Sequence, residues 1–447
     1  MTDVVEPAGP AGEPFRFFDN REKYLLFVPT TSEKAVVGTR IGAELEHLRP
    51  APPAVRVITT GASMKTSTDR ILTTHVGSLA RPTELLDVMK EREHDRPYDK
   101  AHLDMLITEA VADRVRQQVE NGIDIVTDGE MSKVSFLGYV KDRLAGFEVE
   151  QGGGAPAPSW QVEIDQFPEY YADYMGKYAA SVSPLRRLIA RGPISYVGDD
   201  LLRTDIANLK AACEGLDVTD VFMPSSGPSG FGRNEYYPSN AEYLGAAAEA
   251  MRQEYLAIVD AGFILQVDDP WLIEYLTDPT HDWDERVRGC NEHVDAINHA
   301  LRGIPTNKVR HHTCYGLNHG PRLTDVPMAK VVPFMLRVNA GAYSFEVANP
   351  RHQHEYRVWE EHQLPDDKVL IPGLIGHANN YVEHEELIAE YIVRYANIVG
   401  KERVIAGADC GFSSRASYKP EVHPTVVWPK FKHLAMGAEI ATKQLWG

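Results

Sequence analysis

The sequence predicts an α/β protein, a TIM-type (β/α)8 barrel with insertions, and three observations support this fold class. From Met64 onward, short β-branched runs alternate with amphipathic helical stretches, as parallel strands with crossover helices do. Two of these stretches end in glycine directly before a strand, at Gly122 and Gly262, the usual left-handed end of a helix. The chain of 447 residues is long enough for one such barrel.

Composition limits the partners that this protein can have. Lys plus Arg is 46 and Asp plus Glu is 64, so the net charge is −18 and binding to nucleic acid or anionic membrane is disfavoured. The first residues, MTDVVEPAGPAGEP, lack a signal peptide's basic and apolar regions, and no apolar run reaches the ~18 residues of a membrane span. We therefore expect a cytoplasmic protein that acts on small molecules, as a monomer or an oligomer.

The chain divides into an extension and a barrel. Residues 1–63 are expected to be an N-terminal extension, partly disordered or vestigial, because they open with a Pro/Gly/Ala-rich stretch. A small accessory element is the alternative. Residues 64–447 are expected to form the catalytic barrel.

Nine candidate strands occur along the barrel, one more than it needs. Either Ile194–Val197 or Val218–Met223 is expected to lie outside the barrel. Residues 147–192 are Gly/Pro-rich, then aromatic, and predict a long insertion after the second strand. The other candidates are Ile71–Thr74, Ile123–Thr127, Phe263–Val267, Val309–Thr313, Tyr343–Val347, Val369–Leu374 and Val404–Ala408.

Metal-ligating residue types occur at the ends of the later strands. His312 and Cys314 are two apart on one strand, so they share a face and suit two ligands of a tetrahedral zinc. His311 should point the other way. Glu346 and Cys410 lie at two further strand ends, and a barrel brings such ends together at one face. These residues alone leave a metal site and an ordinary buried cluster about equally supported. All four cysteines are expected to be reduced thiols.

Six segments carry a resemblance to a known family: TTHVGSLARP, VTDGE, LQVDDP, HHTC, YSFEVANP and ADCGFSS. In this order they resemble the catalytic domain of cobalamin-independent methionine synthase and its shorter relatives. The resemblance implies a barrel of the uroporphyrinogen decarboxylase and methionine synthase kind. It also implies a methyltransferase that methylates homocysteine, with a zinc bound by His312, Cys314, Glu346 and Cys410. Zinc removes a thiol's proton, and we expect the Glu346 carboxylate to yield its place to the incoming thiol.

The same resemblance assigns the substrate-binding residues. Ser78 would bind the carboxylate of homocysteine, and Glu130 and Asp268 its ammonium group. Each could instead be a helix cap or a turn residue. Asp269 departs from the family, which more often has D-E-P here.

A histidine after the strand at Val369–Leu374 would be the general acid. His377 is the nearest match, although Gly376 stands where the family has a flanking acidic residue, and His384 is the rival. His319, His352 and His354 are expected to be structural or loop residues.

Other reactions stay open. The 63 residues before the barrel are too few for the amino-terminal barrel that helps full-length methionine synthase to bind folate. The donor is therefore left open between methyltetrahydrofolate and another methyl carrier, such as a corrinoid. Epoxyalkane:coenzyme M transferase, of the same superfamily, is the alternative. Its substrate sulfonate would need a cation such as Arg81 or Lys133, whereas paired carboxylates favour an amino-acid thiol. A purely structural zinc site is the third possibility.

Overall fold

Eight parallel strands form the barrel. The structure, a computed structural model, describes residues 63–150, 158–178, 180–184, 186–316 and 320–447. The hydrogen-bonded order of the strands is β1-β11-β10-β9-β8-β7-β5-β2. A parallel bridge between Thr74 and Ile125 joins the two ends of this order, so the predicted barrel is confirmed. Its strands are β1 (Leu72–Thr73), β2 (Ile125–Val126), β5 (Asp220–Ser226), β7 (Ile264–Asp268), β8 (Val309–His312), β9 (Ala342–Glu346), β10 (Val369–Ile375) and β11 (Ile405–Ala408).

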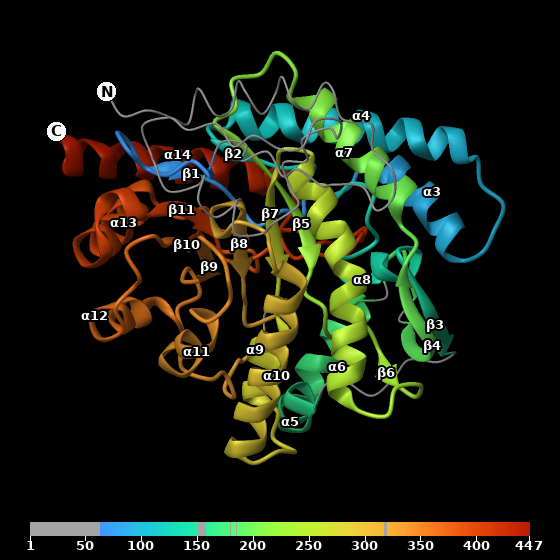
Figure 1. Cartoon of the computed structure of the whole chain (residues 1–447). Coiled ribbons are helices and arrows are strands. Elements are labelled where there is room, and N and C mark those ends of the chain that lie inside the picture. Colours follow the sequence, from blue (N-terminus) through green and yellow to red (C-terminus); the bar gives the residue numbers. More distant parts are fainter. Residues whose placement is uncertain (1–62, 151–157, 179, 185, 317–319) are drawn as a thin grey trace, which may run out of the picture. The chain divides into compact units, whose positions relative to one another are not determined.

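Helices cover the outside of the barrel, and α8 lies alongside α10 in Figure 1. Asp99 and Ser239 accept hydrogen bonds from the first turns of α4 and α8. Beyond their other ends, Gly122 and Gly262 have φ values of 81° and 95°, as expected. The helices are α3 (Thr83–Glu93), α4 (Lys100–Glu120), α7 (Asp199–Cys213), α8 (Asn240–Asp260), α9 (Trp271–Thr277), α10 (Trp283–Leu301), α11 (Met328–Met335), α12 (Val358–Glu361), α13 (Glu385–Val399) and α14 (Pro424–Trp446).

The insertion follows the second barrel strand, as predicted. It contains β3 (Leu144–Glu150), α5 (Pro158–Gln166), α6 (Pro168–Tyr178) and β4 (Arg187–Tyr196). β3 and β4 pair antiparallel and, with β6 (Arg233–Asn234), make a separate three-stranded sheet. The candidate strand Ile194–Val197 belongs to β4 and is the one that lies outside the barrel. Short 3-10 helices, η1 to η4, complete the fold at Gly138–Asp142, Thr306–Lys308, Gln353–Arg357 and Lys401–Arg403.

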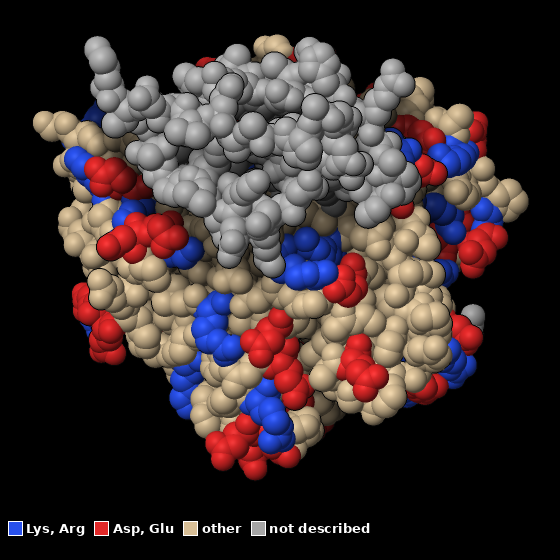
Figure 2. All heavy atoms as spheres, in the orientation of Figure 1, with Lys and Arg blue, Asp and Glu red and all other residues tan. Residues whose placement is uncertain are grey.

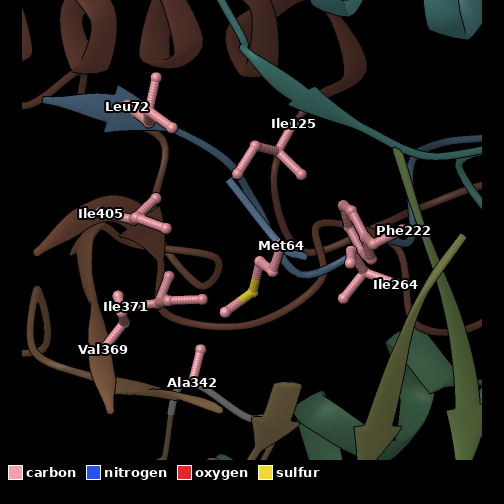
Figure 3. Packing of buried hydrophobic residues seen from close by; sticks show 9 residues of the cluster. All are labelled: Met64, Leu72, Ile125, Phe222, Ile264, Ala342, Val369, Ile371 and Ile405. Carbon is pink, nitrogen blue, oxygen red and sulfur yellow. The ribbon is translucent and has the colours of Figure 1, made fainter. Parts of the chain in front are cut away.

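An apolar cluster fills the amino-terminal end of the barrel, opposite the strand ends that carry the candidate site. Most of its side chains come from the first residues of barrel strands, and Met64 points into their midst (Figure 3). Only 8% of Met64 is exposed, so this residue is part of the barrel core. The cluster consists of Met64, Leu72, Ile125, Phe222, Ile264, Ala342, Val369, Ile371 and Ile405.

On the face shown in Figure 2, acidic and basic side chains of the described residues are intermixed. None of the helices within the described part of the chain combines the length and apolar composition of a membrane crossing. All four cysteines are free thiols, as expected. The predicted extension lies outside the described residues except for Ser63, and the boundary at Met64 stays a prediction.

Candidate metal and thiol site

The residues predicted to form the site lie at or just beyond the carboxyl ends of barrel strands. Parallel strands of a barrel end at one face, so these side chains approach one another although they are far apart in sequence. Every one of them is buried, with at most 7% of the residue exposed. They are Ser78, Glu130, Asp268, His312, Cys314, Glu346, His377 and Cys410.

Three of the four predicted metal ligands form one group. The ligand atoms of His312, Cys314 and Cys410 lie within 4.8 Å of one another, and the two sulfur atoms are 3.4 Å apart. The Nδ1 atom of His312 lies 3.1 Å from the Ser344 hydroxyl. Its Nε2 atom is buried without a hydrogen-bond partner among the described residues. Two sulfurs and an unsatisfied imidazole nitrogen fit a thiophilic divalent cation such as zinc.

The two thiols differ in pKa. The Cys410 thiol donates to the Cys314 sulfur, and this bond, with the nearby His312 imidazole, holds the pKa of Cys314 well below its usual range. The same hydrogen bond, together with burial, raises the pKa of Cys410. Cys314 is therefore the first of the pair to become a thiolate.

Glu346 belongs to a second, neighbouring group. Its ligand atom lies within 4.8 Å of those of His377 and Asp409. Glu346 Oε2 accepts a hydrogen bond of 3.0 Å from the Tyr315 backbone N–H and lies 3.4 Å from Arg322 Nη2. Burial raises the pKa of Glu346, but the charges of Arg322, His377 and His352 and the hydrogen bond from the Tyr315 N–H together outweigh burial, so the net pKa is lowered. The four predicted ligands are thus divided between two groups.

His377 is buried beside this second group. Its Nε2–H donates to the Gly316 carbonyl at 3.2 Å, and its Nδ1 atom has no hydrogen-bond partner within the described ranges. Glu383 occupies part of the space next to Gly376, whose N–H it accepts at 2.8 Å. The rival His384 is the exposed N-cap of α13, away from both groups of candidate ligands.

Glu130 and Asp268 place two buried carboxylates beside each other. Glu130 Oε2 has no hydrogen-bond partner among the residues that the structure describes, whereas Asp268 Oδ1 accepts from Gln266 at 2.7 Å. Burial, with the Glu130 charge close by, raises the pKa of Asp268 to about 7. Glu130 follows Gly129, and both have left-handed backbones, with φ values of 58° and 68°. An unpartnered buried carboxylate oxygen calls for a cationic ligand.

Ser78 approaches the loop that carries Cys410. Its hydroxyl lies 3.3 Å from that of Ser414, and its carbonyl accepts the Phe412 N–H at 3.0 Å. A Cβ at Gly411 would lie 2.0 Å from Ser78 Oγ, so only glycine permits this approach.

The two cations considered for binding a sulfonate, Arg81 and Lys133, donate hydrogen bonds to backbone carbonyls. The Arg81 guanidinium donates to four carbonyls, among them Glu130 at 2.7 Å and Lys133 at 2.8 Å. The Lys133 ammonium donates to the Pro224 carbonyl at 2.6 Å and lies over the Tyr139 ring. These contacts leave each cation less able to bind a substrate anion.

One buried cluster, centred on Asp269, was not predicted from the sequence. The Asp269 carboxylate lies 2.7 Å from His293 Nε2 and 2.8 Å from His311 Nε2, and the Ser229 hydroxyl lies 2.7 Å from the other ring nitrogen of His293, Nδ1. His311 therefore points away from the metal-ligand group, as expected. The departure from D-E-P at Asp269 was the one signal for this cluster. His293 lies on a helix, 24 residues away.

Of the other histidines named from the sequence, His352 and His354 belong to neither ligand group. His352 contacts Asp325 at 3.0 Å and Glu355 at 2.8 Å and stacks on the Tyr315 ring. His354 is exposed. His319 lies outside the described residues.

A cavity opens beside Cys314. Its walls come from the inserted helix α5, from α9 and from the loop after β8, and include Trp160, Glu274, Tyr315 and Arg322. A second molecule bound there would lie next to the Cys314 sulfur.

The fold and the site together define a (β/α)8 barrel with a thiol-rich cluster of candidate metal ligands at its carboxyl-terminal face. The sequence model of the family described as "Cobalamin-independent synthase, Catalytic domain" matches residues 229–425. Methionine synthase of Sulfolobus acidocaldarius is 24% identical over 346 residues, which cover 76% of this chain and 85% of the relative. Methionine synthase of Sulfurisphaera tokodaii is 22% identical, over 83% of this chain and 93% of the relative.

Two solved structures have the same fold. A B12-independent methionine synthase from a Shewanella species, in complex with selenomethionine, has a TM-score of 0.62 at 18% identity and covers 84% of this chain and 99% of its own. A putative B12-independent methionine synthase from Listeria monocytogenes has a TM-score of 0.58 at 19% identity, with coverages of 85% and 99%. The comparisons confirm the resemblance to the catalytic domain of cobalamin-independent methionine synthase and support a transferase of the methionine synthase type.

Proposed function

We propose that this protein transfers a methyl group to the thiol of homocysteine, forming methionine, and that its metal is zinc. The observation that carries the proposal is the buried, unpartnered His312 Nε2 atom beside two thiols that are 3.4 Å apart. His312, Cys314 and Cys410 would hold the metal, and Glu346 would complete the set when no thiol substrate is bound. Zinc would supply a lowered thiol pKa, so that the substrate sulfur reacts as a nucleophilic thiolate.

The chain's own residues would orient the amino acid. Glu130 and Asp268 would accept hydrogen bonds from its ammonium group, and Ser78 would bind its carboxylate. The unpartnered Glu130 oxygen supports this assignment, because a buried carboxylate is stabilised by a cation. The engagement of Arg81 and Lys133 by backbone carbonyls disfavours the sulfonate of coenzyme M, and hence the epoxide reaction.

His377 would serve as the proton donor. Its Nε2–H is held by the Gly316 carbonyl, which leaves Nδ1 as the atom that could carry a proton to the demethylated donor. The donor would occupy the cavity beside Cys314 and is methyltetrahydrofolate or another methyl carrier. A reducing compartment such as the cytoplasm would keep the two thiols available.

Cobalt substitution tests the proposal, because cobalt–thiolate absorption reports on thiol binding. We expect homocysteine to perturb this absorption strongly and coenzyme M weakly. The zinc-loaded protein should form methionine from homocysteine with at least one methyl donor. Tighter binding of coenzyme M than of homocysteine would refute the assignment and favour the epoxide reaction.

A further inference from the structure

Arg322 is buried between Glu346 and Asp325. Its Nε atom lies 3.1 and 3.2 Å from the two carboxylate oxygens of Asp325, and its Nη2 atom lies 3.4 Å from Glu346 Oε2. Only 5% of Arg322 is exposed. A guanidinium keeps its charge at all relevant pH values and holds its donors in a rigid fork, so this arginine joins the two carboxylates.

The surroundings of Arg322 fix its position. Its backbone has a φ of 56°, which residues with a side chain rarely adopt. Asp325 is held in turn by His352 at 3.0 Å. The His352 ring stacks on Tyr315 at 3.8 Å between ring centres, and the guanidinium lies 5.8 Å from the same Tyr315 ring. These contacts hold the Arg322 guanidinium in one position, where it can bind the Glu346 carboxylate.

The Glu346 carboxylate is bound on this side rather than among the thiols. It accepts from the Tyr315 N–H at 3.0 Å and from the Asn349 amide at 3.3 Å, in addition to its contact with Arg322. The ligand group formed by His312, Cys314 and Cys410 does not include it. The carboxylate therefore has a binding place of its own, which we call the Glu346 dock: Arg322, Tyr315 N–H and Asn349.

We propose that Arg322 is a positioning residue that receives the Glu346 carboxylate when the incoming thiol displaces it, and that holds it apart from the His312, Cys314 and Cys410 group while the thiol is bound. This inference rests on the proposed function. The exchange is balanced: the carboxylate moves to the guanidinium as an anion, the thiol arrives as a thiolate, and its proton goes to water. No oxidation or reduction is involved.

The proposal predicts that loss of Arg322 slows metal release and weakens thiol binding. Without Arg322, the Glu346 carboxylate loses its cationic partner and is attracted to the metal instead. The metal should then be retained longer, while the thiol substrate has to displace a more firmly bound carboxylate. A merely structural role for Arg322 predicts the reverse for the metal, because a loosened site releases it faster.

The test compares Arg322→Gln with wild type and with Arg351→Gln in the full-length, zinc-loaded chain. Arg351 contacts the same Asp325 at 3.8 Å but makes no ion pair with Glu346, so it is a matched control. Zinc release to a chromogenic chelator and homocysteine binding by calorimetry are measured. We expect Arg322→Gln to release zinc roughly tenfold more slowly and to bind homocysteine roughly tenfold more weakly, the effect of one charge-assisted contact. Arg351→Gln should match wild type.

Asp325→Asn keeps the proposal testable if Arg322→Gln does not fold. This variant leaves Glu346 as the sole carboxylate partner of Arg322, so zinc should be released faster than from wild type. Faster zinc release from Arg322→Gln, or slower release from Asp325→Asn, would overturn the proposal. A wild-type protein that binds no homocysteine would refute the proposed function, whereas the order of zinc release would still decide the role of Arg322.

Discussion

Glu130→Gln tests how the amino group of the substrate is recognised. Glu130 is 2% exposed, and its Oε2 atom has no hydrogen-bond partner within the described part of the chain, so a bound ammonium would be its first partner. A charge-assisted hydrogen bond of this kind contributes about 1.5–3 kcal/mol. Since about 1.4 kcal/mol corresponds to a tenfold change, the Kd for homocysteine should rise about 10- to 150-fold. Glutamine keeps the size of the side chain and removes its charge.

Calorimetry with two ligands separates recognition from damage to the site. The Kd for 4-mercaptobutyrate, which is homocysteine without its amino group, should be nearly unaffected by Glu130→Gln. Glu163→Gln is the matched control, because this buried glutamate bonds to Tyr171 and Leu323 instead. Zinc content should stay at the wild-type level. Equal losses for both ligands, or an unchanged Kd for homocysteine, would show that Glu130 does not bind the ammonium.

Three further outcomes follow from the structure. Cys410→Ser should lose zinc while circular dichroism shows an intact barrel; full zinc occupancy by elemental analysis would remove Cys410 from the ligand set. A chain that starts at Met64 should fold, retain zinc and stay active, because it keeps the Met64 side chain in the core, whereas insolubility or lost activity would move the domain boundary. Asp269→Asn should lower the free energy of unfolding by about 1–3 kcal/mol in urea titrations, since it weakens the contact to His293 or His311; an unchanged value would contradict this.

The barrel could be predicted because its strands repeat one pattern. Buried parallel strands are continuous apolar runs between helices, and eight of the nine candidate runs are barrel strands. Ile194–Val197 has the same composition. It is the end of a long strand, β4, which pairs antiparallel with β3, and β3 was not expected. Four residues are too few to show whether a strand pairs parallel or antiparallel.

The candidate site was predictable in part. The two-residue spacing places His312 and Cys314 on one face of their strand. Because the carboxyl ends of all barrel strands lie at one face, Cys410 was expected close to them. The spacing gives no information about which carboxylate oxygen is bound by which donor. Glu346 contacts Arg322, which lies between β8 and α11 in a segment whose sequence has no periodic pattern. The contact of His293 with Asp269 depends on the packing of α10 against the barrel.

With the proposed role of Glu130 in substrate binding, the backbone conformation at this residue sets binding against thermal stability. A left-handed conformation costs a residue with a side chain about 1–2 kcal/mol, and glycine avoids this cost. The same position also buries a carboxylate whose Oε2 atom has no hydrogen-bond partner among the described residues. Selection for thermal stability alone would therefore favour Glu130→Gly, and on the proposed role of Glu130 this substitution would weaken binding of the amino acid. To stabilise this enzyme and preserve substrate binding, Glu130 would be retained and stabilising substitutions sought at other positions.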